Sequence, residues 1–183
     1  KIDKCKRLYQ VMEKNLDKWG AIEQFRISYD EFVHNLKKID DLEQIAKKDL
    51  SGLKLKVESC RNNIITKLIP VTNLLTLYAL DHNKKGLRKK MDKSRKNLEG
   101  LKNKDLINHV SEVSAYLEKK FNKQKEKEQD DQLGSYGLSM DLIGKLRSDR
   151  DELVEIKEQL HTENEASEKS NKEIHQLVTE NEK

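Results

Sequence analysis

Two copies of a Glu-x-x-His pattern are the residues of this sequence whose types and spacing could do chemistry. Glu31 and His34 form one copy, and Glu158 and His161 form the other. Residues three positions apart on a helix share one face, so a carboxylate and an imidazole at this spacing can bind the same metal ion. Carboxylate-bridged di-iron bundles use the pattern on two of their helices, which makes a metal-carboxylate bundle one hypothesis for this chain.

The register of the two pairs argues against a metal centre. Phe32 and Leu160 lie on apolar seams, which turns the Glu and His of each pair toward a flank or toward solvent. Ligands of a bundle metal site replace core residues, whereas these pairs bracket them. The sequence also lacks a Gly-rich phosphate loop, a Cys-x-x-Cys, a Gly-x-Ser-x-Gly and a His-Glu-x-x-His. We therefore predict no enzymatic activity, no cofactor and no small-molecule substrate.

The elements that position these residues are predicted to be helices. Of the 183 residues, 38% are charged and 34% are hydrophobic, with 7 Gly and 1 Pro, a composition too poor in turn residues for a strand-rich domain. The longest apolar zone, 68–80, is shorter than the roughly 18 residues of a membrane span and contains Pro70. A soluble all-α protein is therefore predicted. The start of the chain does not identify a compartment, and the cytoplasm is favoured.

Apolar residues recur every three or four positions, which predicts long amphipathic helices. The predicted helices span about 2–47, 53–82, 104–127 and 139–180, and short helices form a broken connector at about 84–102. Asn103 and Ser139 are the expected N-caps of the third and fourth helices. We predict an elongated antiparallel four-helix bundle that forms one domain over 1–183.

The apolar seam of the fourth helix weakens toward its C-terminal end. Leu146, Leu153 and Leu160 are seven apart, but Glu163 and Ser167 follow on the same seam. The last 20 or so residues are therefore expected to be either a frayed tail or the edge of an interface whose partner is another chain.

The two cysteines are expected to be free thiols. Cys5 and Cys60 both fall on apolar helical positions, where an unpaired Cys behaves as a small buried hydrophobe. A turn near 48–52 would separate them by roughly 50 Å along a helical hairpin. Bridged Cα atoms lie within about 7 Å of each other.

Charge is distributed unevenly along the chain. Residues 1–50 carry a net charge of +1, residues 51–127 carry +11 and residues 128–183 carry −8. The basic excess is greatest in 84–104, which makes this connector a candidate for binding nucleic acid or an anionic membrane. The candidate residues are Lys84, Lys85, Arg88, Lys89, Lys90, Lys93, Arg95 and Lys96.

The connector lacks one feature of polyanion sites. It contains no Tyr, Trp or Phe, and proteins that bind phosphate chains commonly add aromatic stacking to their cations. We therefore favour a second interpretation, in which the basic connector lies near the acidic fourth helix of its own chain or of a second copy.

Several segments, taken in chain order, resemble those of a known family. They are Trp19, Phe25, Tyr29, Phe32, Leu36-Lys37-Lys38-Ile39-Asp40, Pro70 within an apolar helix, Ser94 to Leu106 with Lys104-Asp105-Leu106-Ile107, and Tyr136-Gly137-Leu138-Ser139. This order resembles a family of uncharacterised helical proteins common in the Bacteroidetes. The resemblance implies an elongated four-helix bundle without an assigned activity, cofactor or catalytic residue, so no functional residue is carried over.

The sequence thus favours a non-enzymatic structural or protein-interaction module. Self-association is the expected mode, through the fourth helix or the apolar half of the second, because exposed apolar stripes tend to be covered. A polyanion binder and a metal-carboxylate bundle remain the alternatives.

Overall fold

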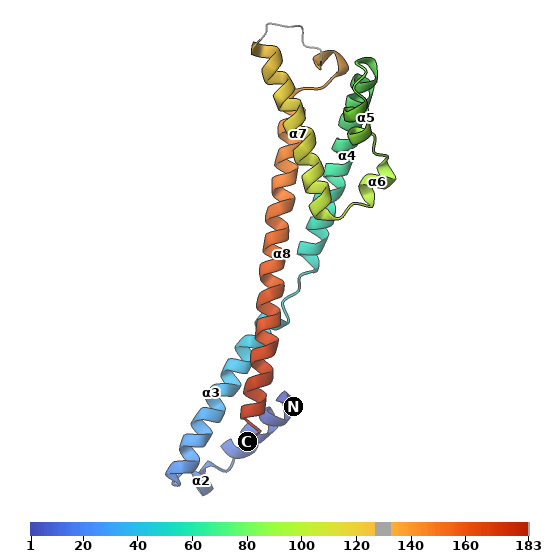
Figure 1. Ribbon diagram of the computed structural model, residues 1–183. Helices are drawn as coiled ribbons and strands as arrows, with labels where there is room; N and C mark the ends of the chain where they lie inside the picture. Colours follow the sequence, from blue (N-terminus) through green and yellow to red (C-terminus); the bar gives the residue numbers. More distant parts are fainter. Residues whose placement is uncertain (127–132, 183) are drawn as a thin grey trace. The chain divides into compact units, whose positions relative to one another are not determined.

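The computed structural model describes residues 1–126 and 133–182. Every regular element in these ranges is a helix, so the all-α prediction is confirmed (Figure 1). In chain order the elements are α1 (Ile2–Glu13), α2 (Leu16–Trp19), α3 (Glu23–Ala46), α4 (Ser51–Asp81), α5 (Lys85–Met91), α6 (Arg95–Glu99), α7 (Asn103–Glu126), the 3-10 helix η1 (Gly134–Tyr136) and α8 (Met140–Glu180). Residue 127, at the predicted end of the third helix, lies outside the described residues.

The chain forms two compact units. Unit 1 takes in residues 1–50 and 160–183, and unit 2 takes in residues 51–159. Each unit has a hydrophobic cluster of its own, which differs from the single domain that the sequence predicted. The boundary within α8 falls where its apolar seam begins to weaken.

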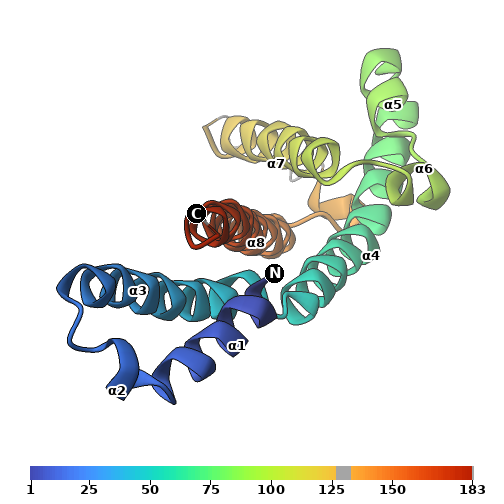
Figure 2. The same cartoon turned by 90° about the horizontal axis from the view of Figure 1, so that it is seen from below.

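Residues 1–46 of unit 1 form a helical hairpin, so the single helix predicted over 2–47 is wrong. α1 runs back along α3 (Figure 2), and Lys6 on α1 forms an ion pair with Asp40 on α3 at 2.7 Å. At the other end of α1, Glu13 accepts a hydrogen bond from the Tyr29 hydroxyl. The two apolar stripes therefore pack against each other within unit 1.

The break that makes this hairpin lies between residues 14 and 22. Asn15 has φ −118° and ψ 23°, and Ile22 is extended with φ −90° and ψ 102°, so neither continues a helix. The Trp19 indole Nε1 donates a hydrogen bond to the Met12 carbonyl at 3.0 Å, and its ring lies 4.6 Å from that of Tyr29, centroid to centroid. Trp19 thus satisfies a carbonyl at the end of α1 and holds the turn closed.

The C-terminal part of α8 packs within unit 1, so the expectation of a frayed tail is wrong. The buried core of unit 1 contains Cys5, Leu36, Ile39, Ile174, Leu177 and Val178. The polar seam residues find partners on α3 and just beyond it: Ser167 Oγ donates to the Ala46 carbonyl at 3.0 Å, and Lys48 pairs with Glu163. Ser167 therefore supplies a hydrogen bond to a carbonyl at the end of α3, where carbonyls lack partners within the helix.

Unit 2 has the larger core, with α4 at its centre. Nineteen buried apolar residues form one cluster, to which α4 contributes Leu68 and Leu75, α7 contributes Val110, and α8 contributes Leu146 and Leu153. α4 lies between α8 on one side and α5 with α6 on the other (Figures 1 and 2). This position buries much of its apolar second half, although Leu77 and Leu80 remain exposed. The helix runs through Pro70 without interruption.

One stretch is long and apolar enough to cross a membrane, contrary to the prediction that no stretch is. The helical stretch 23–81 contains an 18-residue window with a mean hydropathy of 1.3, which is long and apolar enough to cross a membrane. Of that window, 44% is buried inside the protein. A core helix such as α4 passes the same test, so hydropathy by itself assigns it no membrane role.

A sharp turn at the end of α4 sends the chain into the connector. Asn83 has a positive φ of 52°, and the Lys84 and Asn83 amides donate to the carbonyls of Ala79 and Leu80 at 2.7 and 3.1 Å. This pair of bonds is the Schellman pattern, which ends a helix at a left-handed residue. α5 then returns along α4 and buries Met91 in the core.

Arg61 on α4 holds the second half of the connector. Its guanidinium donates to the carbonyls of Glu99 and Leu101, each at 2.6 Å, and to Asn103 Oδ1 at 2.9 Å. Asn103 is the first residue of α7, so its side chain binds Arg61 in place of the predicted capping role. Ser139, by contrast, accepts a hydrogen bond from the Leu142 amide at 3.3 Å, which confirms its predicted capping role for α8.

The two cysteines are free and buried, as predicted. Cys5 belongs to the core of unit 1 and Cys60 to that of unit 2. Burial raises the pKa of the Cys60 thiol, because the thiolate loses solvation in an apolar surrounding.

Candidate interaction surfaces

The two Glu-x-x-His pairs lie on the surface. Glu31 and His34 are exposed on α3, and Glu158 and His161 are exposed on α8. His161 Nε2 lies 3.3 Å from the carboxylate of Glu165, one turn along the same helix. Within 1–126 and 133–182, no group of three or more His, Cys, Asp and Glu residues could hold a metal ion. The pairs are therefore not brought together with further ligands in the part of the chain that is described.

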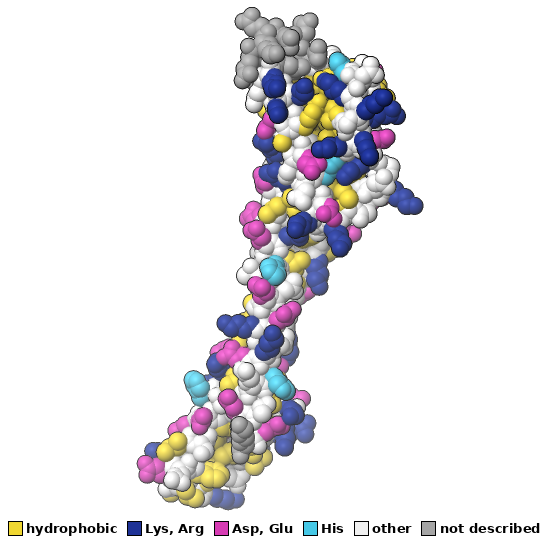
Figure 3. Space-filling view, in the orientation of Figure 1, with side chains coloured by type: hydrophobic (Ala, Val, Ile, Leu, Met, Phe, Trp, Pro, Cys, Tyr) yellow, Lys and Arg dark blue, Asp and Glu magenta, His cyan; other side chains and the backbone are white. Residues whose placement is uncertain are grey.

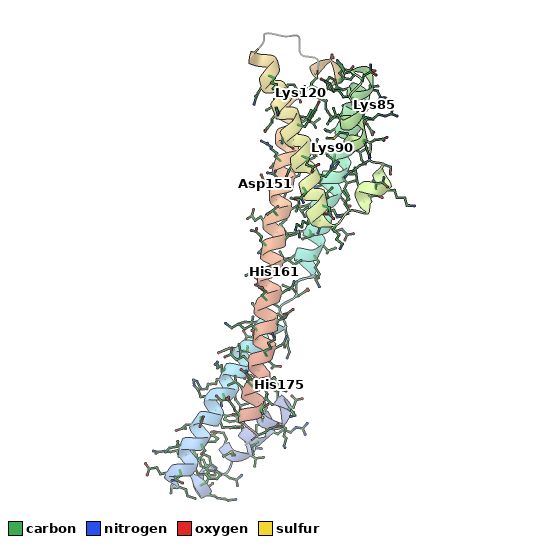
Figure 4. The ribbon with its side chains drawn as sticks, in the orientation of Figure 1. Lys85, Lys90, Lys120, Asp151, His161 and His175 are labelled. Carbon is green, nitrogen blue, oxygen red and sulfur yellow. The ribbon has the colours of Figure 1, made fainter. Side chains whose placement is uncertain are left out.

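The basic residues of the connector form an exposed surface on unit 2. Leu87 packs against the core and Met91 is buried in it, so the outer face of α5 carries the intervening cations. Lys and Arg side chains gather over this part of unit 2 (Figure 3), and Lys85 and Lys90 project from α5 (Figure 4). We call the following five residues the basic face. They are Lys85, Arg88, Lys89, Lys90 and Lys96, all exposed and with side chains that have no hydrogen-bond or ion-pair partner among the described residues.

The other three candidates have local roles. Lys84 Nζ donates to the Tyr78 hydroxyl at 2.5 Å and lies 4.1 Å from the centroid of its ring. Arg95 pairs with Glu99 at 2.7 Å on the same short helix. Lys93 is half-buried, and its charge helps burial to lower the pKa of His109. These three cations stabilise the connector and its neighbours.

The expectation that the connector lies near the acidic fourth helix is wrong within unit 2. α5 and α6 lie on the side of α4 that is turned away from α8 (Figures 1 and 2). In this part of α8, Asp149 pairs with Lys67 on α4 at 2.6 Å, and Arg147 pairs with Glu118 on α7. Leu87 packs α5 against the face of α4 that is turned away from α8. This apolar packing outweighs the attraction between the exposed cations of α5 and the distant acidic residues of α8, because solvent screens it.

Aromatic side chains from outside the connector lie beside it. Tyr78 on α4, His82 just after it and Tyr136 on η1 form a cluster, with the Tyr78 and Tyr136 ring centroids 5.5 Å apart and edge to face. The Tyr136 hydroxyl donates to Asp81 at 2.6 Å, which raises the pKa of that tyrosine. His82 and Tyr136 are half-buried, and the Lys84 ammonium lies over the Tyr78 ring. These rings come from outside 84–104, so the composition of that segment did not predict them.

A second surface lies on unit 1, and sequence reasoning missed it. Seven of the eleven exposed large hydrophobic side chains in the described ranges belong to unit 1. Two of them, Leu8 and Phe25, line an open groove of about 450 Å³ between α1, α3 and the end of α8. We call it the apolar groove. Its lining consists of Leu8, Met12, Phe25, Ser28, Tyr29, Glu31, Phe32, Asn35, Glu180 and Asn181.

The floor of the apolar groove is held in place by polar contacts. Asn35 Nδ2 donates to Asn181 Oδ1 at 3.0 Å, which joins α3 to the last turn of the chain. Tyr29 donates its hydroxyl hydrogen bond to Glu13, and burial together with this carboxylate raises its pKa. The Phe25 ring stands at the edge, 48% exposed, with its centroid 5.6 Å from that of Trp19.

Comparison with known proteins assigns no relative. No protein-family model, curated protein or solved structure matches the chain. The two surfaces and their chemistry are therefore the basis for a functional proposal.

Proposed function

We propose that the protein is a non-enzymatic helical module that binds another protein through the apolar groove of unit 1. The observation that carries the proposal is the concentration of exposed apolar side chains there, with Phe25 48% and Leu8 46% exposed at the edge of a concave surface. Exposed apolar patches on soluble proteins mark interaction sites, because covering them removes apolar area from water. The groove lining holds no His or Cys.

Partner capture with matched variants tests this proposal. The full chain is immobilised and exposed to an extract of its source cells, alongside Phe25→Ser and a control, Leu55→Ser. Leu55 is an equally apolar, 66% exposed residue of unit 2. We expect a partner that the wild type and the control retain and that Phe25→Ser loses. Retention of the same proteins by all three would contradict the proposal.

Self-association is the form of protein binding that the sequence favoured, and light scattering at several concentrations tests it. The apolar half of α4 buries Leu68, Leu75 and Tyr78 in the core of unit 2, although Leu77 and Leu80 are exposed. Most of the exposed large hydrophobic side chains belong to unit 1, so the apolar groove is the better candidate for a contact between copies. A mass that rises with concentration, and that Phe25→Ser restores to one chain, would assign the groove to a second copy.

A second candidate function is polyanion binding by the basic face of unit 2. It is favoured by five exposed cations that no described residue neutralises. We expect salt-dependent binding to duplex DNA, single-stranded RNA or anionic vesicles, lost in a Lys85→Gln, Arg88→Gln, Lys89→Gln variant. The same three changes at Arg7, Lys14 and Lys37 on unit 1 provide the control. Absence of salt-dependent binding to all three probes removes this candidate.

We also propose that the four longest helices assemble as the antiparallel bundle that the sequence predicted. α3, α4, α7 and α8 contain 24, 31, 24 and 41 residues. Small-angle scattering of the full chain tests this proposal, and a scattering profile that four packed antiparallel helices do not fit would contradict it.

A further inference from the structure

We infer that the occupant of the apolar groove is a basic amphipathic helix of a partner protein. This inference rests on the proposed function and names the chemistry of the partner. A helix laid in a groove buries its apolar stripe and leaves its charged flanks at the rim, so each part of the groove specifies a part of the partner.

The apolar part of the groove fits one helix face. Leu8 and Met12 from α1 face Phe25 and Phe32 from α3, so two helices supply opposite walls. The α3 lining runs from Phe25 to Asn35, which is about 15 Å at 1.5 Å per residue. A partner helix of about three turns matches this length and places three or four apolar side chains in the groove.

The charge of the groove lining determines which charge the partner helix should carry. Glu31 and Glu180 line the groove, both exposed and neither with a partner among the described residues, and no Lys or Arg is part of the lining. A helix with Lys or Arg beside its apolar stripe brings its cations to these carboxylates. An acidic helix would instead place like charges against them.

A second copy of this chain does not offer such a helix in the part that is described. The most basic helix is α5, and its apolar side chains Leu87 and Met91 pack in the core of unit 2. Presenting them to another copy would require α5 to leave α4. A different protein is therefore the occupant that the charges and the packing favour.

A titration with two probe peptides tests the inference. Both are helices of about 14 residues with Leu at the same i, i+3, i+4 and i+7 positions, and they differ only in having Lys or Glu elsewhere. Trp19, the only tryptophan, contacts Phe25, so its fluorescence reports binding in the groove of the full chain. We expect the Lys peptide to bind at least about tenfold more tightly than the Glu peptide at low salt.

Variants assign the contacts separately. Phe25→Ser removes an apolar wall, and we expect it to weaken binding of the Lys peptide about tenfold. Glu31→Gln with Glu180→Gln leaves the walls intact, and we expect it to weaken the Lys peptide about fivefold and to reduce the salt dependence. Leu55→Ser is the control, and it should bind the Lys peptide as the wild type does. Calorimetry replaces fluorescence for Phe25→Ser, because that change alters the surroundings of Trp19.

The outcomes distinguish this inference from the proposed function. Equal binding of the two peptides, or binding that ignores the two Glu changes, overturns the basic partner and leaves the groove as a protein-binding surface. Leu8→Ser removes the opposite apolar wall. If neither Phe25→Ser nor Leu8→Ser weakens binding of the Lys peptide, the assignment of the binding site to the groove is overturned. Binding of neither peptide overturns the inference as well, and only the capture experiment then decides the proposed function. A dimer that Phe25→Ser dissociates assigns the groove to a second copy and overturns the inference.

Discussion

Unit 1 and unit 2 are both made of helices, but they differ in how many of their apolar side chains are buried. Unit 2 buries nineteen apolar residues in one cluster around α4 and leaves its charges outside, whereas the buried cluster of unit 1 has six residues. Unit 1 nevertheless has most of the exposed large hydrophobic side chains. The difference indicates that unit 2 is stabilised mainly by its own core, while unit 1 leaves more apolar surface exposed.

The largest effect that tests this comparison is the truncation of a core residue in each unit. Leu75 in unit 2 and Ile39 in unit 1 are both fully buried, so Leu75→Ala and Ile39→Ala should each lower the free energy of unfolding by about 2–5 kcal/mol. Trp19 lies in unit 1, so its fluorescence follows that unit while circular dichroism follows all helices. We expect Ile39→Ala to shift the fluorescence transition in urea and Leu75→Ala to shift mainly the circular dichroism transition.

The exposed residue Leu55 provides the control, since Leu55→Ala should change stability by less than about 0.5 kcal/mol. If both core variants shift both signals by equal amounts, the two units unfold as one and the comparison loses its basis.

Arg61 tests a second difference, in how each unit holds its main turn. Unit 2 anchors its connector with a guanidinium that donates to two carbonyls and an amide oxygen. The turn of unit 1 is held by neutral donors, with side-chain bonds from Trp19 to the Met12 carbonyl and from Asn15 to the Val11 carbonyl. We expect Arg61→Ala to cost about 2 kcal/mol, because charged donors are lost and carbonyls are left unpaired. Arg61→Lys should restore only part of this, since an ammonium cannot reproduce the planar fork.

Hydrogen exchange locates the effect of Arg61. In the wild type the amides of 95–101 should exchange more slowly than those of 15–22, and in Arg61→Ala this order should be reversed or lost. An unchanged exchange rate in 95–101 would mean that Leu98 and Met91, and not Arg61, hold the connector.

His109 gives unit 2 a pH dependence. The imidazole on α7 is 4% exposed, and its Nε2 has no hydrogen-bond partner in the described structure. Burial, aided by the charge of Lys93, lowers its pKa below the ordinary 6.5, so the folded protein holds it neutral. The unfolded chain therefore binds more protons as pH falls below 6.5, and unit 2 loses stability over that range.

The test is urea unfolding followed by circular dichroism between pH 7.5 and pH 5. We expect His109→Leu to be less sensitive to acid than the wild type, and the exposed-site change His175→Gln in unit 1 to keep the wild-type dependence. A His109→Leu variant that is as acid-sensitive as the wild type would show that other groups cause the loss.

The helical class was predictable because a spacing of three and four residues leaves no alternative to amphipathic helices. The same spacing concealed the break in unit 1. Cys5, Tyr9 and Met12 keep the phase of Phe32 and Leu36 even though the chain reverses between them. A hairpin whose two arms face each other preserves the apolar pattern of one continuous helix. Asn15 and Gly20, both poor helix formers, were the available signal.

The candidate surfaces were predictable only in part. The basic residues of 84–104 are visible in the sequence, but which of them are neutralised depends on where α5 packs, and Leu87 decides that through contacts distant along the chain. The apolar groove could not be predicted, because Phe25 and Leu8 follow the same periodicity as core residues. Whether an apolar stripe is buried or exposed depends on how many helices surround it, and in unit 1 fewer helices do so.

The smallest expected effect compares one ion pair from each unit. Lys67 and Asp149 lie 2.6 Å apart in unit 2, and Lys48 and Glu163 form a comparable pair in unit 1. Partly exposed pairs of this kind contribute about 0.5 kcal/mol, since solvent and side-chain entropy offset most of the attraction. Double-mutant cycles with Lys→Met and carboxylate→Gln or Asn changes measure each coupling. Small and equal coupling free energies in both units would mean that the units differ in apolar burial and not in ion pairing. A coupling above about 2 kcal/mol in unit 1 would mean that ion pairs compensate for its small core.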